Sequence, residues 1–325
     1  MVIQWPKGAL QRPKQSHAEI EMALYRGQKW RYAEAKIHHT CSIFKRLCFS
    51  NTGFCYPTGL KLTKRKDFIT EMAKVISFSN QKGGVGKTTS CVNIAAQIAN
   101  KGNKKVLLID MDPQGNATSG LGLSKSKIKK TIYDVIIGRC DIKDAVIKTK
   151  FKNLSVVPAT IDLAAAELEL YELEENTNFS KIALDSIADD YDYIFIDCPP
   201  SLGMLTVNAL SISNGIVIPM QCEFYSLEGM SQLLNTVKKI RQLYNPSLQI
   251  VGILLTMYNG RLTLTNQVVA ELRKYYSELL FKVPISRTVR ISEAPGYGEP
   301  ICYHDPYGKG ALEYAAVSKE LMMRI

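Results

Sequence analysis

The glycine-rich stretch at residues 79–90, SNQKGGVGKTTS, constrains the fold of this chain more than any other segment. It follows an apolar run at 74–79 and precedes a run with helical spacing at 88–100. Its three glycines can adopt positive φ angles and let backbone N–H groups converge on anionic oxygens, and the start of a helix adds partial positive charge. A strand, a glycine-rich loop and a helix in this order predict a phosphate-binding loop.

The loop carries two lysines. Lys87 is placed to reach the β- and γ-phosphates of a nucleotide, and the Thr88 hydroxyl is placed to bind Mg²⁺. The common loop, G-x-x-x-x-G-K-[ST], would have glycine at position 81, whereas this chain has Gln81 followed by Lys82. We therefore expect the nucleotide to be bound by Lys82, Gly83, Gly84, Val85, Gly86, Lys87, Thr88 and Thr89.

From residue 72 onward, apolar strand patterns alternate with amphipathic helical patterns. Most of the strand patterns are continuously apolar, as strands covered on both faces must be. This order predicts an α/β fold of the P-loop NTPase type, with a doubly wound, mostly parallel sheet, helices on both faces and functional residues at the carboxyl ends of the strands. The expected strands lie at 74–79, 104–112, 154–159, 191–198, 215–221 and 248–258, and the expected helices at 88–100, 161–175, 205–213, 226–244, 266–280 and 311–323.

Three aspartates stand at the ends of predicted strands. Asp110 and Asp112 belong to LLIDMDPQGN, and Asp197 belongs to YIFIDCPP. A strand-end aspartate can simply form a turn or cap a helix. Three of them on sheet ends beside one phosphate loop favour metal binding and catalysis instead.

The two-lysine loop resembles the deviant Walker A loop, K-G-G-x-G-K-[ST], of the ATPase family that includes ParA/Soj partition proteins, MinD division-site ATPases and nitrogenase iron protein. The resemblance covers residues 72–325 and is closest to ParA/Soj, through DPQGNATSGLG, QCEFYSLEGMSQLLNT, LTMYNGRLTLTNQVV and RTVRISEAPGYGEPI. It implies a Mg²⁺-dependent ATPase that binds ATP as a homodimer. Lys82 would then reach the partner's phosphates, Asp112 would position the attacking water, and Asp197 and Thr88 would hold Mg²⁺. Asp110 would support the metal's water shell or Lys82.

The resemblance also implies partitioning of a chromosome or plasmid by a cytoplasmic, nucleoid-associated protein. It implies non-specific DNA binding through Arg261 and Arg290, and a slow ATPase stimulated by a ParB-like partner. Read from the residues alone, either arginine could equally be an ordinary surface cation. The alternatives are a MinD-like membrane-cycling ATPase and a cargo-positioning ATPase.

No membrane partner is expected, because the last segment differs from a basic amphipathic helix. Residues 309–325 carry only Lys309, Lys319 and Arg324 as cations, and their apolar spacing suits packing on the core. The basic stretch at 124–130, SKSKIKK, is interpreted as a solvated loop.

Residues 1–71 differ from the rest in charge. They hold 13 Lys and Arg against 5 Asp and Glu, and so carry eight of the eleven net positive charges. They show no sustained period of helix or strand and no pair of helices that would make an operator-binding helix-turn-helix. We expect a basic extension that is either disordered or an upstream stretch included by the choice of start codon, followed by an ATPase domain at 72–325.

The eight cysteines include no C-x-x-C pair. Cys41, Cys48 and Cys55 are spaced by seven residues, and a zinc site would more often show pairs two to four residues apart. The chain also lacks an apolar leader and any run approaching the roughly 18 apolar residues that span a membrane. Together these features favour a reducing cytosol.

Overall fold

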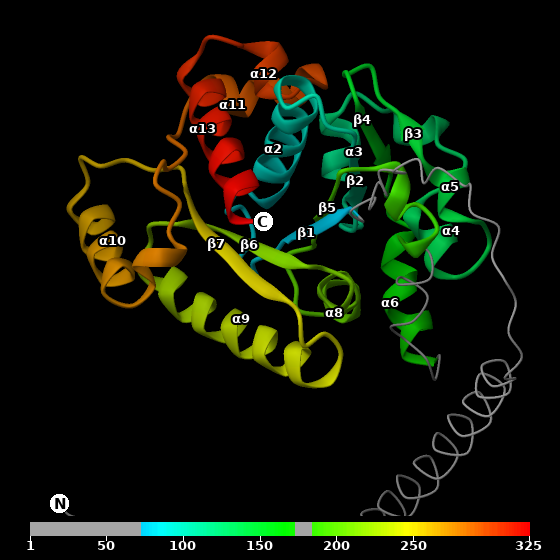
Figure 1. Cartoon of the computed structure of the whole chain (residues 1–325), viewed down its shortest axis with the longest axis horizontal. Helices are drawn as coiled ribbons and strands as arrows, with labels where there is room; N and C mark the ends of the chain where they lie inside the picture. Colours follow the sequence, from blue (N-terminus) through cyan, green and yellow to red (C-terminus); the bar gives the residue numbers. More distant parts are fainter. Residues whose placement is uncertain (1–72, 173–183) are drawn as a thin grey trace, which may run out of the picture. The chain divides into compact units, whose positions relative to one another are not determined.

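Seven strands form one sheet, in the order β3-β4-β2-β5-β1-β6-β7, in the computed structural model, which describes residues 73–172 and 184–325 (Figure 1). All neighbouring strands are parallel except β3 and β4, which pair antiparallel. The strands are β1 (Lys74–Phe78), β2 (Val106–Asp110), β3 (Ile147–Lys148), β4 (Leu154–Val157), β5 (Tyr193–Asp197), β6 (Gly215–Gln221) and β7 (Gln249–Thr256).

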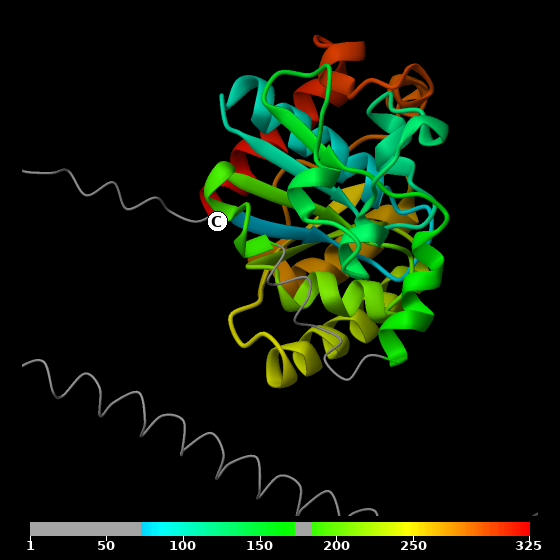
Figure 2. The ribbon, with the colours of Figure 1, turned by 90° about the vertical axis from the view of Figure 1, so that its right-hand side faces the viewer.

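Helices cover both faces of this sheet, with α2 on one side and α9 on the other (Figures 1 and 2). Successive strand side chains point to opposite faces, so Ile76 packs in the core beneath α2 whereas Val75 packs in a second core on the far side. The helices are α2 (Lys87–Lys101), α3 (Asn116–Gly120), α4 (Ile132–Ile136), α5 (Ile142–Ala145), α6 (Leu163–Glu172), α8 (Met204–Ser211), α9 (Phe224–Leu243), α10 (Thr263–Tyr276), α11 (Val289–Glu293), α12 (Ile301–His304) and α13 (Lys309–Arg324).

The prediction of a doubly wound, mostly parallel sheet is confirmed. Each expected strand and each expected helix has a counterpart, and β6 has the expected bounds. All six expected helices begin one to three residues away from the position that the apolar pattern indicated. Helix α6 begins later, at Leu163, and the other five begin earlier, at Lys87, Met204, Phe224, Thr263 and Lys309. Apolar spacing locates a helix through its buried turns and does not fix its end residues.

The closing helix α13 packs on the core, as its apolar spacing predicted. Tyr314, Val317 and Leu321 are buried, and Tyr314 is the largest of them. The last turn is also fixed, because the Arg324 guanidinium donates hydrogen bonds to the carbonyl oxygens of Val251, Leu279 and Leu280. In the part of the chain that the structure describes, no helix is long and apolar enough to span a membrane.

The sheet brings the phosphate loop and the aspartates to one edge. Phe78, the last residue of β1, pairs with Asp197, and Asp197 pairs with Asp110 at the end of β2. The loops that follow these three central strands therefore begin side by side. The predictions for residues 1–71, including those for their cysteines and histidines, lie outside the described residues.

Candidate active site

The loop between β1 and α2 has the backbone conformation of a phosphate-binding loop. Gly84 and Gly86 have φ angles of 72° and 81°, in the left-handed region that favours glycine. The φ angle of Gly83 is not positive, so only two of the loop's three glycines adopt the left-handed conformation. Gly86 also caps the amino end of α2, whose first residue is Lys87.

Hydrogen bonds from two neighbouring strands hold the loop in place. The Thr256 hydroxyl, at the end of β7, donates to the carbonyl oxygen of Val85 over 2.8 Å. The Gln221 side-chain amide, at the end of β6, donates to the carbonyl oxygen of Gly84 over 2.9 Å. These two bonds fix the backbone of the loop against the ends of β6 and β7.

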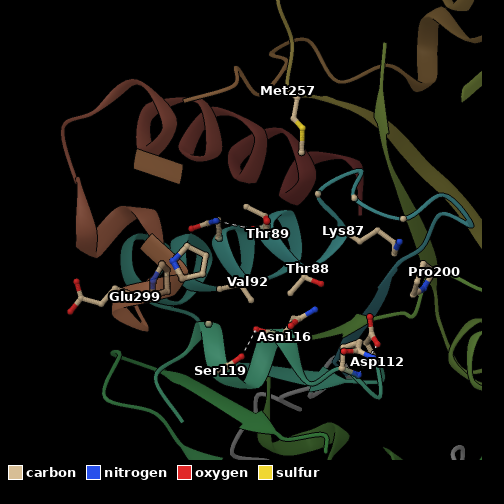
Figure 3. Close-up of a pocket in the computed structure, with 18 residues that line it drawn as sticks. Lys87, Thr88, Thr89, Val92, Asp112, Asn116, Ser119, Pro200, Met257 and Glu299 are labelled. Carbon is tan, nitrogen blue, oxygen red and sulfur yellow. Dashed lines mark hydrogen bonds between the residues drawn. The ribbon is translucent and has the colours of Figure 1, made fainter. Parts of the chain in front are cut away.

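A cavity of about 450 Å³ lies in front of this loop (Figure 3). Its size falls within the usual range for small-molecule sites. Six of the eight residues expected to bind nucleotide line it: Gly83, Gly84, Gly86, Lys87, Thr88 and Thr89. A second cavity of about 200 Å³ adjoins it, between Met257 and residues 285–292.

Lys87 lies almost fully buried, with 6% of its surface exposed. Its Nζ donates a hydrogen bond to the carbonyl oxygen of Lys82 over 3.0 Å. Burial lowers the pKa of this amino group, and the charges of Asp197 and Asp112 act against that shift. The lysine side chain is thus folded back along the loop, to the carbonyl oxygen of Lys82.

Asp197 is fully buried, and the described residues offer its carboxylate the nearby Thr88 hydroxyl but no hydrogen bond of normal geometry. Burial raises its pKa well above the ordinary value, and the charge of Asp110 adds to the shift. A buried carboxylate without a partner is costly unless a ligand completes it. An oxygen-seeking cation such as Mg²⁺ fits this position, with the Thr88 hydroxyl beside it in the cavity wall.

Asp110 is also fully buried, but its oxygens are engaged. Oδ1 accepts a hydrogen bond from the backbone N–H of Asp112 over 3.2 Å. Oδ2 accepts bonds from the backbone N–H and the hydroxyl of Thr118, over 2.8 and 2.7 Å. Burial raises the pKa of Asp110 to about 6 despite these bonds. In this single chain the carboxylate organises the loop that follows β2 and does not line the cavity.

Asp112 lines the cavity, with 7% of its surface exposed. Its Oδ1 accepts a hydrogen bond from the backbone N–H of Gln114 over 2.9 Å. Asp110, Asp112 and Asp197 therefore lie at the same edge of the sheet as the phosphate loop, as expected, but their surroundings differ. Only Asp112 faces the open cavity.

Lys82 does not line the cavity of its own chain. Its amino group forms an ion pair with the carboxylate of Glu223, which precedes α9, and both side chains are partly exposed. Its backbone N–H donates to Oδ1 of Asn80 over 3.0 Å. We assigned Glu223 no function from the sequence, although an acid directly after β6 stands at the edge where functional residues gather.

Arg261 and Arg290 lie on the surface, outside both cavities. Arg261 is exposed in the loop before α10. Arg290 stands on the short helix α11, with 65% of its side chain exposed and Glu293 at 3.3 Å. Its neighbours Ile291 and Ser292 line the smaller cavity, so this surface is continuous with the site.

Comparison with known proteins shows the family to which the chain is similar. Residues 73–250 match the model of a family described as an AAA domain. The chain is 50% identical over 250 residues to the sporulation initiation inhibitor protein Soj of Bacillus subtilis, a match that covers 77% of this chain and 98% of Soj. It is 47% identical over 253 residues to the chromosome partitioning protein ParA of Myxococcus xanthus, which covers 78% of this chain and 89% of that protein.

A solved structure is similar to this chain in both fold and sequence. It is described as cobyrinic acid a,c-diamide synthase from Mycobacterium smegmatis, bound to an ATP analogue and magnesium. The two chains share 34% identity with a TM-score of 0.68, over 76% of this chain and 93% of that one.

Proposed function

Because the chain belongs to the ParA/Soj family of partition ATPases, we propose that it is the ATP-driven, DNA-binding component of a chromosome or plasmid partition system. Its reaction is the hydrolysis of ATP to ADP and phosphate, with Mg²⁺ as cofactor. In this proposal ATP joins two chains into a homodimer, and the dimer binds DNA without regard to sequence. A ParB-like partner stimulates hydrolysis and so releases the DNA.

The observation that carries the proposal is the orientation of Lys82. Lys87, Thr88 and Asp112 face the cavity of their own chain, whereas Lys82 is bonded outside it to Glu223. A triphosphate brings several negative charges into this cavity, and one buried lysine neutralises only part of them. A second subunit that brings its own Lys82 to the phosphates would supply the missing cation.

Each residue then has a separate task. The loop's N–H groups and Lys87 bind the phosphates, and Thr88 and Asp197 hold the cation. Mg²⁺, when bound, neutralises charge on the phosphate oxygens. Asp112 orients the attacking water, and Lys82 of the second subunit stabilises the charge that develops during transfer.

The smaller cavity suits the base of the nucleotide. It begins at Gly86 and Thr89, where the phosphate loop ends, and continues between Met257 and residues 285–292. The apolar side chains of Met257 and Ile291 can flank a planar ring, while Ser286 and Thr288 offer polar groups at its edge. The nucleotide would therefore extend from Asp197 toward α11.

The exposure of Arg290 on α11 supports the proposal that it contacts DNA. Contacts with phosphates need charge and reach and no pattern of base recognition. The Glu293 carboxylate is the nearby group that DNA would have to displace, and an ion pair this exposed is weak, at about 0–1 kcal/mol. Arg290→Glu should keep ATP-dependent dimerisation and lose DNA binding.

The experiment that tests this function is co-sedimentation of the full chain with non-specific DNA and, separately, with anionic liposomes, each with and without Mg-ATP. We expect ATP-dependent binding to DNA that weakens as salt is raised, and no binding of Arg290→Glu. Binding to liposomes in place of DNA would support the MinD-like, membrane-cycling alternative. A cargo-positioning ATPase would bind DNA as well, and the replicon's loss rate in cells lacking the protein separates it from a partition ATPase.

A further inference from the structure

The hydroxyl of Thr118 lies at the centre of a buried hydrogen-bond network. It donates to Oδ2 of Asp110 over 2.7 Å and accepts a bond from the backbone N–H of Ala159 over 3.0 Å. All three residues have 0% of their surface exposed. Thr118 belongs to α3 and Ala159 follows β4, so one hydroxyl joins the ends of two neighbouring strands through the helix between them.

The network continues to the residue that faces the cavity. The second oxygen of Asp110, Oδ1, accepts the backbone N–H of Asp112, and the Asp112 carboxylate in turn accepts the N–H of Gln114. The loop also approaches the segment after β4 at Gly115, where φ is 57° and an added Cβ would lie 2.6 Å from the carbonyl oxygen of Ala159. The segment that carries Asp112 is thus fastened to the protein on both sides of the aspartate.

We propose that Thr118 is a positioning residue for ATP hydrolysis. Its hydroxyl fixes the orientation of the Asp110 carboxylate, and that carboxylate fixes the backbone of Asp112. This inference rests on the proposed function, in which Asp112 orients the attacking water. A threonine or serine can both donate to the carboxylate and accept from Ala159, whereas valine has the same shape as threonine and can do neither.

The test is Thr118→Val in the full chain, with ATP binding measured separately from turnover. Loss of geometry around a water-positioning group lowers turnover by about tenfold to a hundredfold. We expect that loss in kcat for Mg-ATP hydrolysis, while the Kd for Mg-ATP changes by less than about twofold, because the phosphate loop is untouched. Thr118→Ser should restore kcat, and Thr118→Ala should behave like Thr118→Val.

Thr131→Val is the matched control. Thr131 is another buried threonine whose hydroxyl donates to an aspartate, Oδ2 of Asp134, over 3.1 Å, and it caps α4 with its hydroxyl bonded to Asp134 and not to Asp110. It should lower the melting temperature as Thr118→Val does, with no loss of kcat. In an Asp110→Ala background, Thr118→Val should have no further effect on kcat, because the two residues act through one another.

Two results would overturn the inference. One is a wild-type kcat in Thr118→Val, and the other is a loss of ATP affinity in step with kcat, which indicates a purely structural residue. Asp112→Ala is assayed in parallel. If Asp112→Ala hydrolyses ATP normally, the assignment of Asp112 fails, whereas a failure of Thr118→Val alone leaves that assignment intact.

Discussion

At the residue scale, the contact between Lys82 and Glu223 separates the single chain from the proposed dimer. The amino group of Lys82 is bonded within its own chain, and the two side chains are 34% and 52% exposed. Ion pairs with this exposure contribute about 0–1 kcal/mol. The pair therefore holds Lys82 only weakly. Breaking it costs about 1 kcal/mol or less, so Lys82 can exchange Glu223 for the phosphates bound to a second subunit.

Glu223→Gln should make ATP-dependent dimerisation easier. Removing the carboxylate frees Lys82 in both subunits, and the gain of at most about 1 kcal/mol per subunit corresponds to at most about a thirtyfold lower protein concentration at half-dimerisation. Sedimentation velocity with Mg-ATP measures this midpoint. Glu271→Gln is the control, since Glu271 forms an exposed ion pair with Lys274 on α10. A higher midpoint for Glu223→Gln than for the control would show that Glu223 contributes to the dimer itself.

Asp110 should give the nucleotide-free protein a pH-dependent stability. Its pKa is raised from 3.8 to about 6 by burial. The folded state then holds this proton more tightly than the unfolded state, so its stabilising effect is full below pH 3.8 and is lost as the pH rises through about 6. The free energy of unfolding of the wild type should thus fall, relative to Asp110→Asn, by an amount on the order of 1–3 kcal/mol across this window. Urea denaturation at several pH values measures the difference, and parallel curves for the two proteins would contradict it.

At the element scale, the phosphate loop depends on backbone conformation more than on space. An added Cβ would meet no atom within 4 Å at either Gly83 or Gly84, yet only Gly84 has a positive φ, of 72°. The two positions therefore separate conformational strain from steric clash.

Gly84→Ala should destabilise the protein by about 1–2 kcal/mol, because alanine is strained in the left-handed region. Gly83→Ala should change stability little, since its backbone is already in a conformation open to alanine. Both variants are compared by urea denaturation and by titration with Mg-ATP. Equal losses of stability would show that the loop's shape does not depend on the conformation at Gly84.

The long elements could be predicted from the sequence, and the short ones could not. Strand β6 and the helix α2 carry clear apolar patterns, and the P-loop between β1 and α2 has a distinctive spacing. The two-residue strand β3 and the helices α3 and α11, of five residues each, are too short to form without the rest of the fold. Glu223 and Thr118 were missed because their contacts, with Lys82 and Asp110, join segments that only the sheet brings together.

At the scale of the whole molecule, the sheet brings residues from three central strands to one site. In the proposed dimer, one further positive charge at that site comes from the second subunit. The proposed site in one subunit uses Lys87, Asp112 and Asp197 of that subunit and Lys82 of the other. Two chains that are each inactive could then form one active site together, if they lack different parts of it.

Mixing Lys82→Ala with Lys87→Ala should restore ATP hydrolysis. In the mixed dimer the Lys82→Ala chain binds ATP, and the Lys87→Ala chain supplies Lys82. Each mixed dimer holds one complete site out of two, so full pairing of the two variants predicts at most roughly half of the wild-type activity. Each variant mixed with itself gives the baseline. A mixture no more active than this baseline, although a crosslinker detects mixed dimers, would place Lys82 in its own subunit's site.

The most direct test is the mass of the full chain in Mg-ATP, measured by sedimentation velocity. The Asp112→Ala variant should bind ATP without hydrolysing it and should therefore accumulate as a dimer. Adding Lys82→Ala to that variant should return it to a monomer with ATP still bound, because the charge that joins the subunits has been removed. A dimer that forms equally well without Lys82, or a monomer in both variants, would contradict a site that two subunits share.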